Sequence, residues 1–266
     1  MDIRIGFIGC GNMATAMIQG IIQSGLIPPQ HIFASRRTET ALEQLRVTYN
    51  IQTTTDNKEV ASKSDIIVLG VKPNKYLPLM EELVQYNLQG KIYVSIAPGK
   101  TLAFLEQGLG SGTKIIRTMP NTPAMVNAGM TAVCPNSHVT DAECSLILRI
   151  MQTFGKAELI DESLFDAAVA VAGSSPAYVF MFIEAMADAA VKEGMARPQA
   201  YRFAAQAVLG SAKLALETGK HPAELKDMVC SPAGTTIEAV VQLEKHGFRS
   251  AVMEAMTACA AKSKHV

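Results

Sequence analysis

The chain lacks any arrangement of cysteines that indicates a disulfide framework or a metal site. Its 266 residues include five cysteines, at positions 10, 134, 144, 230 and 259, and none of them forms a CxxC motif. Because their number is odd and the five histidines show no metal-type spacing either, we expect no metal site. A reducing compartment is the simplest interpretation, so a cytoplasmic location is expected.

An excess of one charge and a long apolar run are also missing. The 24 basic residues balance the 24 acidic residues, so no overall field attracts nucleic acid or an acidic membrane surface. No uninterrupted apolar run reaches about 18 residues, which argues against a membrane-spanning helix. The opening MDIRIGFIGCG has neither the basic segment nor the cleavage site of a secretory signal. We therefore expect no nucleic-acid partner and no membrane partner.

The chain does contain enough apolar residues, 48%, to bury the core of one large domain or two modest ones. Its first half alternates short β-branched runs with helical stretches, which predicts a doubly wound, mostly parallel sheet with helices on both faces. The expected strands are Ile3–Ile8, His31–Ala34, Asp65–Val71, Ile92–Ile96 and Lys114–Arg117, and the expected helices between them include Met13–Ser24, Thr38–Thr48 and Lys75–Tyr86.

In the second half, Ala-, Met- and Leu-rich helical segments replace the strand-like runs. This change predicts a Rossmann-type α/β domain at residues 1–160 and an all-helical domain at residues 161–266. The segment Ala177–Val191 has only Glu184 and Asp188 as charges, and a helix that is apolar nearly all round must be buried. A second subunit is expected to cover it, which predicts a homodimer, with an ordinary tight bundle as the alternative.

A dinucleotide motif of the form G-x-G-x-x-A spans Gly9 to Ala14, between an expected strand and an expected helix. Gly9 permits the tight turn, Gly11 lets the pyrophosphate approach the backbone, and Ala14 allows close packing of helix and strand. The start of the helix offers free N–H groups and a positive dipole to the phosphates. A purely structural glycine turn is the alternative.

The end of the second expected strand indicates which cofactor binds. Enzymes that use NAD usually carry Asp or Glu there to hold the ribose 2′-hydroxyl. This chain has Ser35-Arg36-Arg37 and no carboxylate before Glu39. Two guanidinium groups and a hydroxyl suit a 2′-phosphate, so NADPH is predicted over NADH. The alternative is that Arg36 and Arg37 are solvated residues at the start of a helix.

Two further segments follow strands at their carboxyl ends, where open α/β sheets bind ligands. Val71-Lys72-Pro73 follows DIIVLG, and Ala97-Pro98-Gly99 follows IYVSI. Small residues and proline give a flat backbone wall for the nicotinamide ribose. Lys72 either contacts the cofactor or is simply exposed.

In the helical half, a Ser-Pro-x-Gly-Thr-Thr loop at Ser231–Thr236 leads into a helix. Such a loop offers several free N–H groups and hydroxyls, which together form an anion pocket for a carboxylate. Simple N-capping by a hydroxyl residue is the alternative.

Together these motifs closely resemble the pyrroline-5-carboxylate reductase family, over essentially the whole chain. The resemblance is carried by GFIGCGNMA, VKP, RTMPNTP, SPAY and, most specifically, LKDMVCSPAGTTIEAV. Members of this family reduce 1-pyrroline-5-carboxylate to L-proline with NAD(P)H, the last step of proline biosynthesis. The resemblance implies a Rossmann domain followed by a helical dimerisation domain, and family dimers often assemble further into decamers.

The resemblance also implies roles for individual residues. The implied substrate-binding residues are Glu162, Ser231, Gly234, Thr235 and Thr236. The N–H groups of Thr235 and Thr236 would hold the carboxylate, and the Thr236 hydroxyl would bond the ring nitrogen. The implied cofactor residues are Ile8, Gly9, Cys10, Gly11, Asn12 and Met13 at the pyrophosphate; Ser35, Arg36 and Arg37 at the 2′-phosphate; Asn57 on the adenosine side; and Gly70, Val71, Lys72, Pro73, Ile96, Ala97 and Pro98 at the nicotinamide half.

The chain departs from the family pattern at a few positions. Ser175 and Ala233 stand where the family usually has glycine, and an Asn often found near Met228 is absent. These local differences concern the fine geometry of the substrate site.

Three other functions are weighed against this one. A β-hydroxyacid dehydrogenase has the same two-domain plan but needs a base, typically a Lys early in the first long helix between the domains, and Pro176–Val191 contains none. A generic imine reductase would not need the carboxylate pocket. A non-catalytic NADPH sensor would keep the glycine motif but not that pocket. Reduction of a cyclic iminium needs no strong general acid, so Thr236 is predicted to orient the substrate nitrogen and relay a proton.

Overall fold

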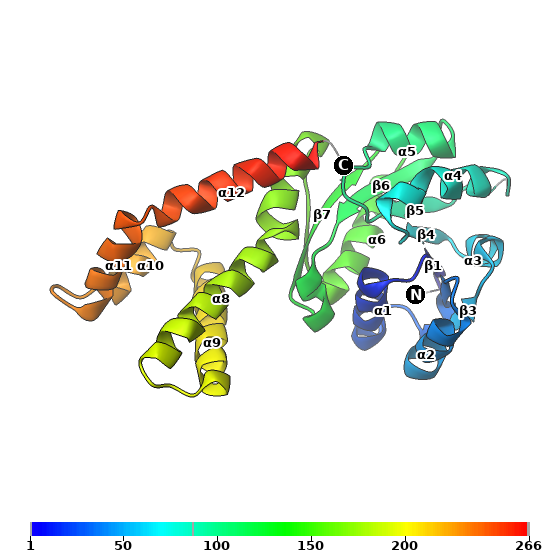
Figure 1. Cartoon of the computed structure of the whole chain (residues 1–266). Helices are drawn as coiled ribbons and strands as arrows, with labels where there is room; N and C mark the ends of the chain where they lie inside the picture. The colour runs from blue at the N-terminus through cyan, green and yellow to red at the C-terminus, as the bar shows by residue number, and fades with distance from the viewer. Residues whose placement is uncertain (1, 87, 265–266) are drawn as a thin grey trace. The chain divides into compact units, whose positions relative to one another are not determined.

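The computed structural model describes residues 2–86 and 88–264, which form two compact units. The first unit runs as far as Ser174 and also includes the end of the last helix, from Cys259 onward. The second unit is Ser175–Ala258. Figure 1 labels the elements of both units.

The first unit is built on an eight-stranded sheet with the strand order β3-β2-β1-β4-β5-β6-β7-β8. Neighbouring strands from β3 to β6 pair in parallel, β7 runs antiparallel to β6, and β8 runs parallel to β7. The strands are β1 (Ile5–Ile8), β2 (Ile32–Ser35), β3 (Gln52–Thr54), β4 (Ile66–Leu69), β5 (Ile92–Ser95), β6 (Lys114–Met119), β7 (Gly129–Pro135) and β8 (Gly155–Leu159).

The strand order reverses at β1, which lies between β2 and β4. In open α/β sheets this reversal opens a crevice at the carboxyl ends of the strands, and ligands bind there. The predicted glycine motif follows β1 directly, so the fold places it at the reversal point.

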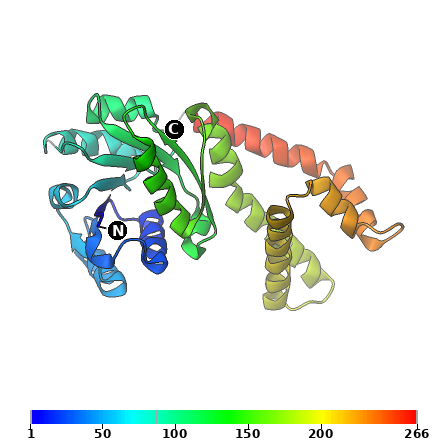
Figure 2. The ribbon, with the colours of Figure 1, turned by 180° about the vertical axis from the view of Figure 1, so that it is seen from behind.

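Helices cover both faces of this sheet, because its strands are apolar on both sides. In β4, Ile66 and Val68 belong to one buried cluster, while Ile67 and Leu69 belong to the other. The first cluster includes residues of α1, α2 and α6, and the second includes residues of α3, α4 and α5. Figure 2 shows α1 and α6 from the side opposite to the view of Figure 1. The helices of the first unit are α1 (Asn12–Ser24), α2 (Glu39–Tyr49), α3 (Asn57–Lys63), α4 (Tyr76–Val84), α5 (Leu102–Leu109), α6 (Asp141–Met151) and α7 (Phe165–Ala168), with short turns η1 (Pro29–His31), η2 (Pro73–Lys75), η3 (Thr122–Val126), η4 (Gln152–Phe154), η5 (Glu162–Leu164) and the π-helical η6 (Val169–Gly173).

The predicted fold class is confirmed, although the sheet has more strands than the sequence indicated. All five expected strands are present, but β3, β7 and β8 were not predicted. β3 is only three residues long and polar, and β7 begins with glycine and ends with proline, so both have the composition of loops. In β8 only Ala157 is buried, which leaves no apolar run to detect.

The compact first unit extends beyond residue 160, where the sequence placed the domain boundary. Phe165 is almost fully buried and packs with Ala132 and Cys134 of β7. Ser263, near the end of the last helix, is also buried. Packing therefore divides the chain after Ser174, later than the change in composition.

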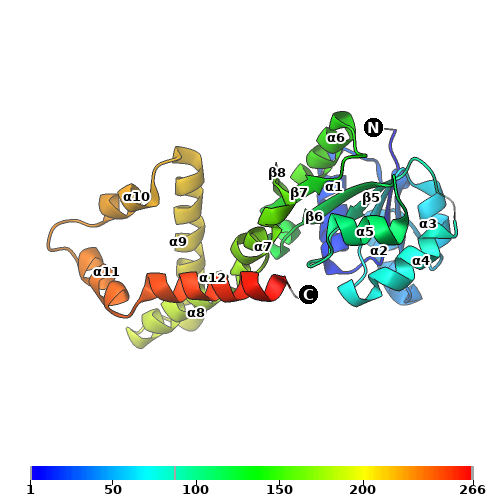
Figure 3. The ribbon, with the colours of Figure 1, turned by 90° about the horizontal axis from the view of Figure 1, so that it is seen from above.

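The second unit consists of helices alone, as Figure 3 shows from above. Its helices are α8 (Ser175–Lys192), α9 (Arg197–Thr218), α10 (Pro222–Val229), α11 (Thr235–Lys245) and most of α12 (Phe248–Ser263). α8 packs against α9, yet large apolar side chains on both helices are exposed, among them Phe180, Met181 and Phe203. An apolar surface of this kind marks an interaction site.

Within the described residues, one helical stretch, Glu162–Lys192, is long and apolar enough to cross a membrane when judged by length and composition. The sequence predicted no such helix, because no uninterrupted apolar run reaches about 18 residues. Isolated charges do not make the stretch polar, however. A helix that a second subunit covers has the same composition, so this feature alone does not indicate a membrane.

Candidate functional site

The glycine loop after β1 leaves room for a ligand against the start of α1. Gly9 has a φ of +86°, and a Cβ placed on it would lie 2.5 Å from Val71 Cγ1, so only glycine fits this turn. A Cβ on Gly11 would meet no atom within 4 Å, so the space above this residue is open. Gly11 caps α1 without any side-chain hydrogen bond, which leaves the first N–H groups of the helix available. This arrangement fits a dinucleotide pyrophosphate.

The end of β2 is tied to this loop by Ser35. Its carbonyl oxygen accepts hydrogen bonds from the N–H groups of Gly9, at 3.1 Å, and Cys10, at 3.0 Å. Its hydroxyl donates to Asn57 Oδ1 at 2.7 Å, and the residue is only 1% exposed. The Ser35 hydroxyl is therefore engaged with Asn57, and its contact with the 2′-phosphate stays a prediction. Arg36, the next residue along the chain, is exposed to solvent.

Arg36 and Arg37 are both exposed and follow the end of β2 directly. The positive charge of Arg36 lowers the pKa of Cys10 in the glycine loop. Burial raises the pKa of the Cys10 thiol to about 11, against the opposing effects of a hydrogen bond to Thr15 and of Arg36. Cys10 is therefore a neutral, buried thiol at physiological pH, while the two guanidinium groups are free to pair with an anion.

Tyr76, at the start of α4, connects the two segments predicted to flank the nicotinamide. Its hydroxyl donates to the carbonyl oxygen of Leu69, at 2.7 Å, where β4 ends. The Ser95 hydroxyl, where β5 ends, lies 3.1 Å away, and backbone N–H groups of Ile96 and Ala97 also contact the Tyr76 oxygen. Burial raises the pKa of Tyr76 to about 12, so the phenol stays protonated and keeps its donor. The loops after β4 and β5 are thus held by one buried hydroxyl.

Glu162 is engaged with neighbours of the first unit. Its Oε1 atom accepts hydrogen bonds from the Leu102 N–H, at 2.7 Å, and from Arg117 Nη1, at 2.9 Å. The guanidinium of Arg117 is buried and lies 4.2 Å from the ring centroid of Phe165. Glu162 therefore joins the start of α5 to the end of β6. Its contact with substrate stays a prediction.

Asn121 fixes the turn that follows β6. Its amide nitrogen donates to the carbonyl oxygen of Ala172, at 2.9 Å, and its Oδ1 atom accepts from the Met130 N–H, also at 2.9 Å. One buried side chain thus links the start of β7 to the π-helical turn η6. Turns of this kind are frequent at functional sites.

The predicted anion loop, Ser231–Thr236, lies in the second unit at the start of α11. The N–H of Gly234 bonds the Ser231 carbonyl oxygen at 3.0 Å, and a Cβ on Gly234 would lie 2.3 Å from Ser231 Oγ. Gly234 caps α11 without a side-chain hydrogen bond, so capping by a hydroxyl residue does not occur there. Thr235 and Thr236 are the first two residues of the helix, so their N–H groups have no partner within the helix, and their contact with a ligand stays a prediction.

The loop also explains why glycine is usual at one of the positions where this chain departs from the family. Ala233 has a φ of +54°, in the left-handed region that favours glycine. Ala233 is exposed, so its Cβ is not buried against neighbouring groups, and the strain lies in its own backbone conformation.

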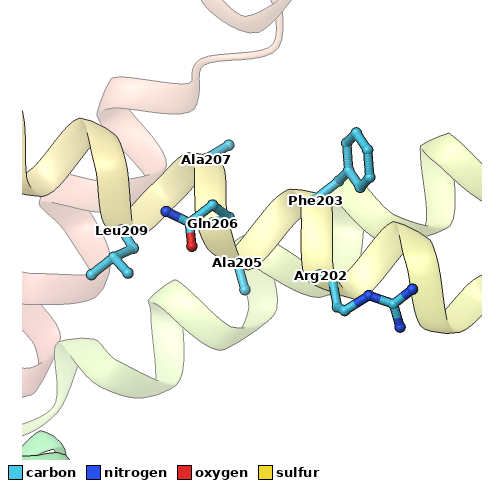
Figure 4. A pocket seen from close by; sticks show the side chains of 6 residues that line it. All are labelled: Arg202, Phe203, Ala205, Gln206, Ala207 and Leu209. Carbon is cyan, nitrogen blue, oxygen red and sulfur yellow. The ribbon is translucent and has the colours of Figure 1, made fainter.

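The second unit also contains a hollow. It measures about 680 Å³, runs along α9 and is lined by Arg202, Phe203, Ala205, Gln206, Ala207 and Leu209. Figure 4 shows these side chains spread along a single helix. No predicted site residue lines this hollow, which belongs to the exposed apolar surface of α8 and α9 and not to the cofactor site.

Comparisons with known proteins place this geometry in a family. The family model for pyrroline-5-carboxylate reductase dimerisation matches residues 162–266, and one described as NADP oxidoreductase coenzyme F420-dependent matches residues 4–99. A curated pyrroline-5-carboxylate reductase of Escherichia coli (strain K12) is 53% identical over 264 residues, which cover 99% of this chain and 98% of the relative. The chain belongs to the pyrroline-5-carboxylate reductase family.

Other members of the pyrroline-5-carboxylate reductase family agree over the whole length. The reductase of Methanosarcina acetivorans is 43% identical, with 99% of this chain and 97% of the relative covered. The solved structure from Coxiella burnetii superposes with a TM-score of 0.93 at 34% identity, covering 100% of this chain and 98% of that one. The Plasmodium falciparum structure, which has NADP bound, gives 0.90 at 32% identity and covers 99% and 98%. The family and the class of cofactor predicted from the sequence are confirmed.

Sequence reasoning missed several residues that the structure shows beside the predicted site segments. Tyr76 and Glu82 were given no role, although both hydrogen-bond to residues at or beside the cofactor segments. Arg117 and Asn121 stand in the RTMPNTP motif, but their partners lie between 9 and 51 residues away. The sequence offered one signal for Arg117, which is its place in an expected strand. A charged side chain in a buried strand needs a partner, because unpaired charges are rarely buried.

Proposed function

We propose that this protein reduces 1-pyrroline-5-carboxylate to L-proline with NAD(P)H, the last step of proline biosynthesis. The observation that carries the proposal is the family match, which extends over both units at 53% identity. The geometry supports it, because a dinucleotide cradle in the first unit is accompanied by an uncapped helix start in the second. A sensor without catalysis would not need the second feature.

The cofactor residues act by binding and orienting. When bound, the nicotinamide cofactor supplies hydride to the imine carbon. The N–H groups at the start of α1 hold the pyrophosphate, and Arg36 with Arg37 pairs the 2′-phosphate, which favours NADPH. The loops Gly70–Pro73 and Ile96–Pro98, held by Tyr76, form the wall beside the nicotinamide half.

The substrate residues act on a small anion that carries a basic nitrogen. The N–H groups of Thr235 and Thr236 hold the carboxylate at the start of α11, where the helix dipole favours negative charge. The Thr236 hydroxyl orients the ring nitrogen. Protonation of that nitrogen makes the adjacent carbon electrophilic, so hydride adds to carbon and the proton remains on nitrogen. Glu162 lies near the substrate in this proposal.

The test follows the absorbance of NADPH and of NADH with 1-pyrroline-5-carboxylate, in the wild type and in Thr236→Ala. We expect oxidation of both cofactors by the wild type, with NADPH preferred, and at least about a tenfold loss of kcat in the variant. Thr257→Ala is a matched control, because the Thr257 hydroxyl bonds only the Met253 carbonyl within α12 among the described residues. Oxidation of neither cofactor by the wild type contradicts the function, and full activity of Thr236→Ala contradicts its assigned role.

We further propose that the protein is a cytoplasmic homodimer able to assemble further, up to a decamer. The exposed apolar side chains of α8 and α9 and the hollow along α9 support this, since a second copy would bury them. Light scattering after gel filtration measures the assembly, and a monomer at micromolar concentration contradicts the proposal.

A further inference from the structure

A carboxylate of α4 reaches the adenosine side of the cofactor site through hydrogen bonds. Glu82 Oε2 accepts a hydrogen bond from Asn57 Nδ2 at 3.1 Å, and Asn57 Oδ1 accepts one from the Ser35 hydroxyl at 2.7 Å. On its other side, Glu82 Oε1 accepts from the Tyr86 hydroxyl at 2.5 Å. These contacts join the end of β2, the start of α3 and the last turn of α4, which Figure 1 labels. Glu82 is partly buried.

Glu82 fixes the direction of every hydrogen bond in this row. An ionised carboxylate only accepts, so the Asn57 amide must turn its NH₂ group toward Glu82 and its oxygen toward Ser35. Ser35 must then donate its single hydroxyl hydrogen to Asn57. What remains on the Ser35 oxygen is acceptor capacity, which a phosphate cannot use because a phosphate dianion also accepts only.

The phenol of Tyr86 does not remove this negative charge. Burial and hydrogen bonding to Glu82 raise the pKa of Tyr86 to about 12, so the phenol donates a hydrogen bond but stays neutral. Lys58 lies over the Tyr86 ring, with its ammonium 5.6 Å from the centroid, and Asp56 contributes a further negative charge. The Glu82 carboxylate is connected to Ser35 by two successive hydrogen bonds through Asn57. Ser35 directly precedes Arg36 and Arg37 in the chain.

We propose that Glu82 is a residue that determines cofactor specificity, by opposing the 2′-phosphate of NADPH and so keeping NADH usable. It does this through its charge and through the hydrogen-bond direction it imposes on Asn57 and Ser35. A ribose 2′-hydroxyl carries no charge and is not opposed. Glu82 thus counteracts Arg36 and Arg37. The inference rests on the proposed function, because it concerns the cofactor site assigned there.

Glu82→Gln tests this role with little change of shape. A neutral amide removes the charge and can present either its oxygen or its NH₂ group, so Asn57 can turn and Ser35 can donate to phosphate. We expect the affinity ratio of NADPH to NADH to rise about threefold to tenfold, the size of one charge removed at roughly 10 Å in a screened site. Calorimetric titration of each reduced cofactor, without substrate, measures the ratio.

Two control variants separate this effect from others. Glu81→Gln makes the same charge change at the neighbouring exposed position, and Glu81 makes no hydrogen bond or ion pair within the described part of the chain. Tyr86→Phe keeps the Glu82 charge and its bond to Asn57. Both controls should leave the ratio within about twofold of the wild type.

The possible results have distinct meanings. A raised ratio in Glu82→Gln alone supports the specificity role. A ratio unchanged in Glu82→Gln, or equal weakening of both cofactors, overturns it, because a merely structural residue would affect both alike. An equal rise in Glu81→Gln also overturns it, since the effect would then be one of general charge. A wild type that binds neither cofactor contradicts the proposed function itself, and the inference with it.

Discussion

Replacing Tyr76 by phenylalanine removes one oxygen atom from a buried junction and leaves the ring in place. In the wild type that oxygen donates to Leu69 at the end of β4 and contacts the Ser95 hydroxyl at the end of β5. Tyr76 and Ser95 are both 0% exposed, so water cannot replace the lost partner. The variant therefore leaves buried polar groups without a hydrogen bond.

The magnitude follows from the cost of such a group. A buried donor or acceptor left unsatisfied costs about 1–3 kcal/mol, and the packing of the ring is unchanged. For a protein of this size, each kcal/mol lowers the melting temperature by about 2–4 °C. We expect Tyr76→Phe to melt roughly 2–12 °C below the wild type at equal protein concentration.

Scanning calorimetry or circular dichroism at neutral pH measures this difference. Tyr93→Phe is the matched control, because Tyr93 is also buried, in β5, and burial is the only cause found for its raised pKa. Its hydroxyl has no hydrogen bond within the described part of the chain, so its removal should cost less than about 0.5 kcal/mol. Equal melting temperatures for the wild type and Tyr76→Phe, or equal losses in both variants, would refute the reasoning.

Two further predictions concern stability. Ala233→Gly should stabilise the protein by about 1 kcal/mol, because the φ of +54° strains an alanine but not a glycine; a urea midpoint that does not rise contradicts this. Glu143→Gln tests a pH dependence: burial raises the pKa of Glu143, but hydrogen bonds from Lys114 and Thr140 outweigh it and hold the pKa below 4.5. A lowered pKa stabilises the fold above the unfolded value of 4.5, and this contribution is lost as the pH falls through the lower folded value. The variant should therefore be about 1 kcal/mol less stable near neutral pH and approach the wild type below pH 4.5; a constant difference in melting temperature would rule this out.

The sequence was informative wherever a structural signal is local. Ile66–Leu69 is a buried strand with apolar side chains toward both faces, and such a run is visible without any tertiary information. Gly9 was predicted to permit a tight turn, and Gly11 was predicted to let a pyrophosphate approach the backbone. The structure shows a close contact at Gly9 and open space at Gly11. Both features depend on a few consecutive residues.

Features that depend on distant partners could not be predicted. Ser35 and Asn57 were both assigned to the cofactor, but nothing in the sequence shows that their side chains bond each other across 22 residues. Glu82 adds a partner a further 25 residues away, on a helix whose exposed charges look alike in sequence. The extension of the first unit beyond residue 160 likewise depends on Phe165 packing against β7.

The end of α12 has a consequence for the order in which the chain folds. Cys259 Sγ lies 3.2 Å from Ser174 Oγ, and Ser263 is buried within the same unit. During synthesis, the ribosome must finish the whole helical unit before these residues emerge. The first unit therefore stays incomplete until residues 259–263 are made, and a fragment that stops at residue 174 lacks a part of its own packing. The packing of the first unit is thereby coupled to the synthesis of the helical unit that precedes Cys259.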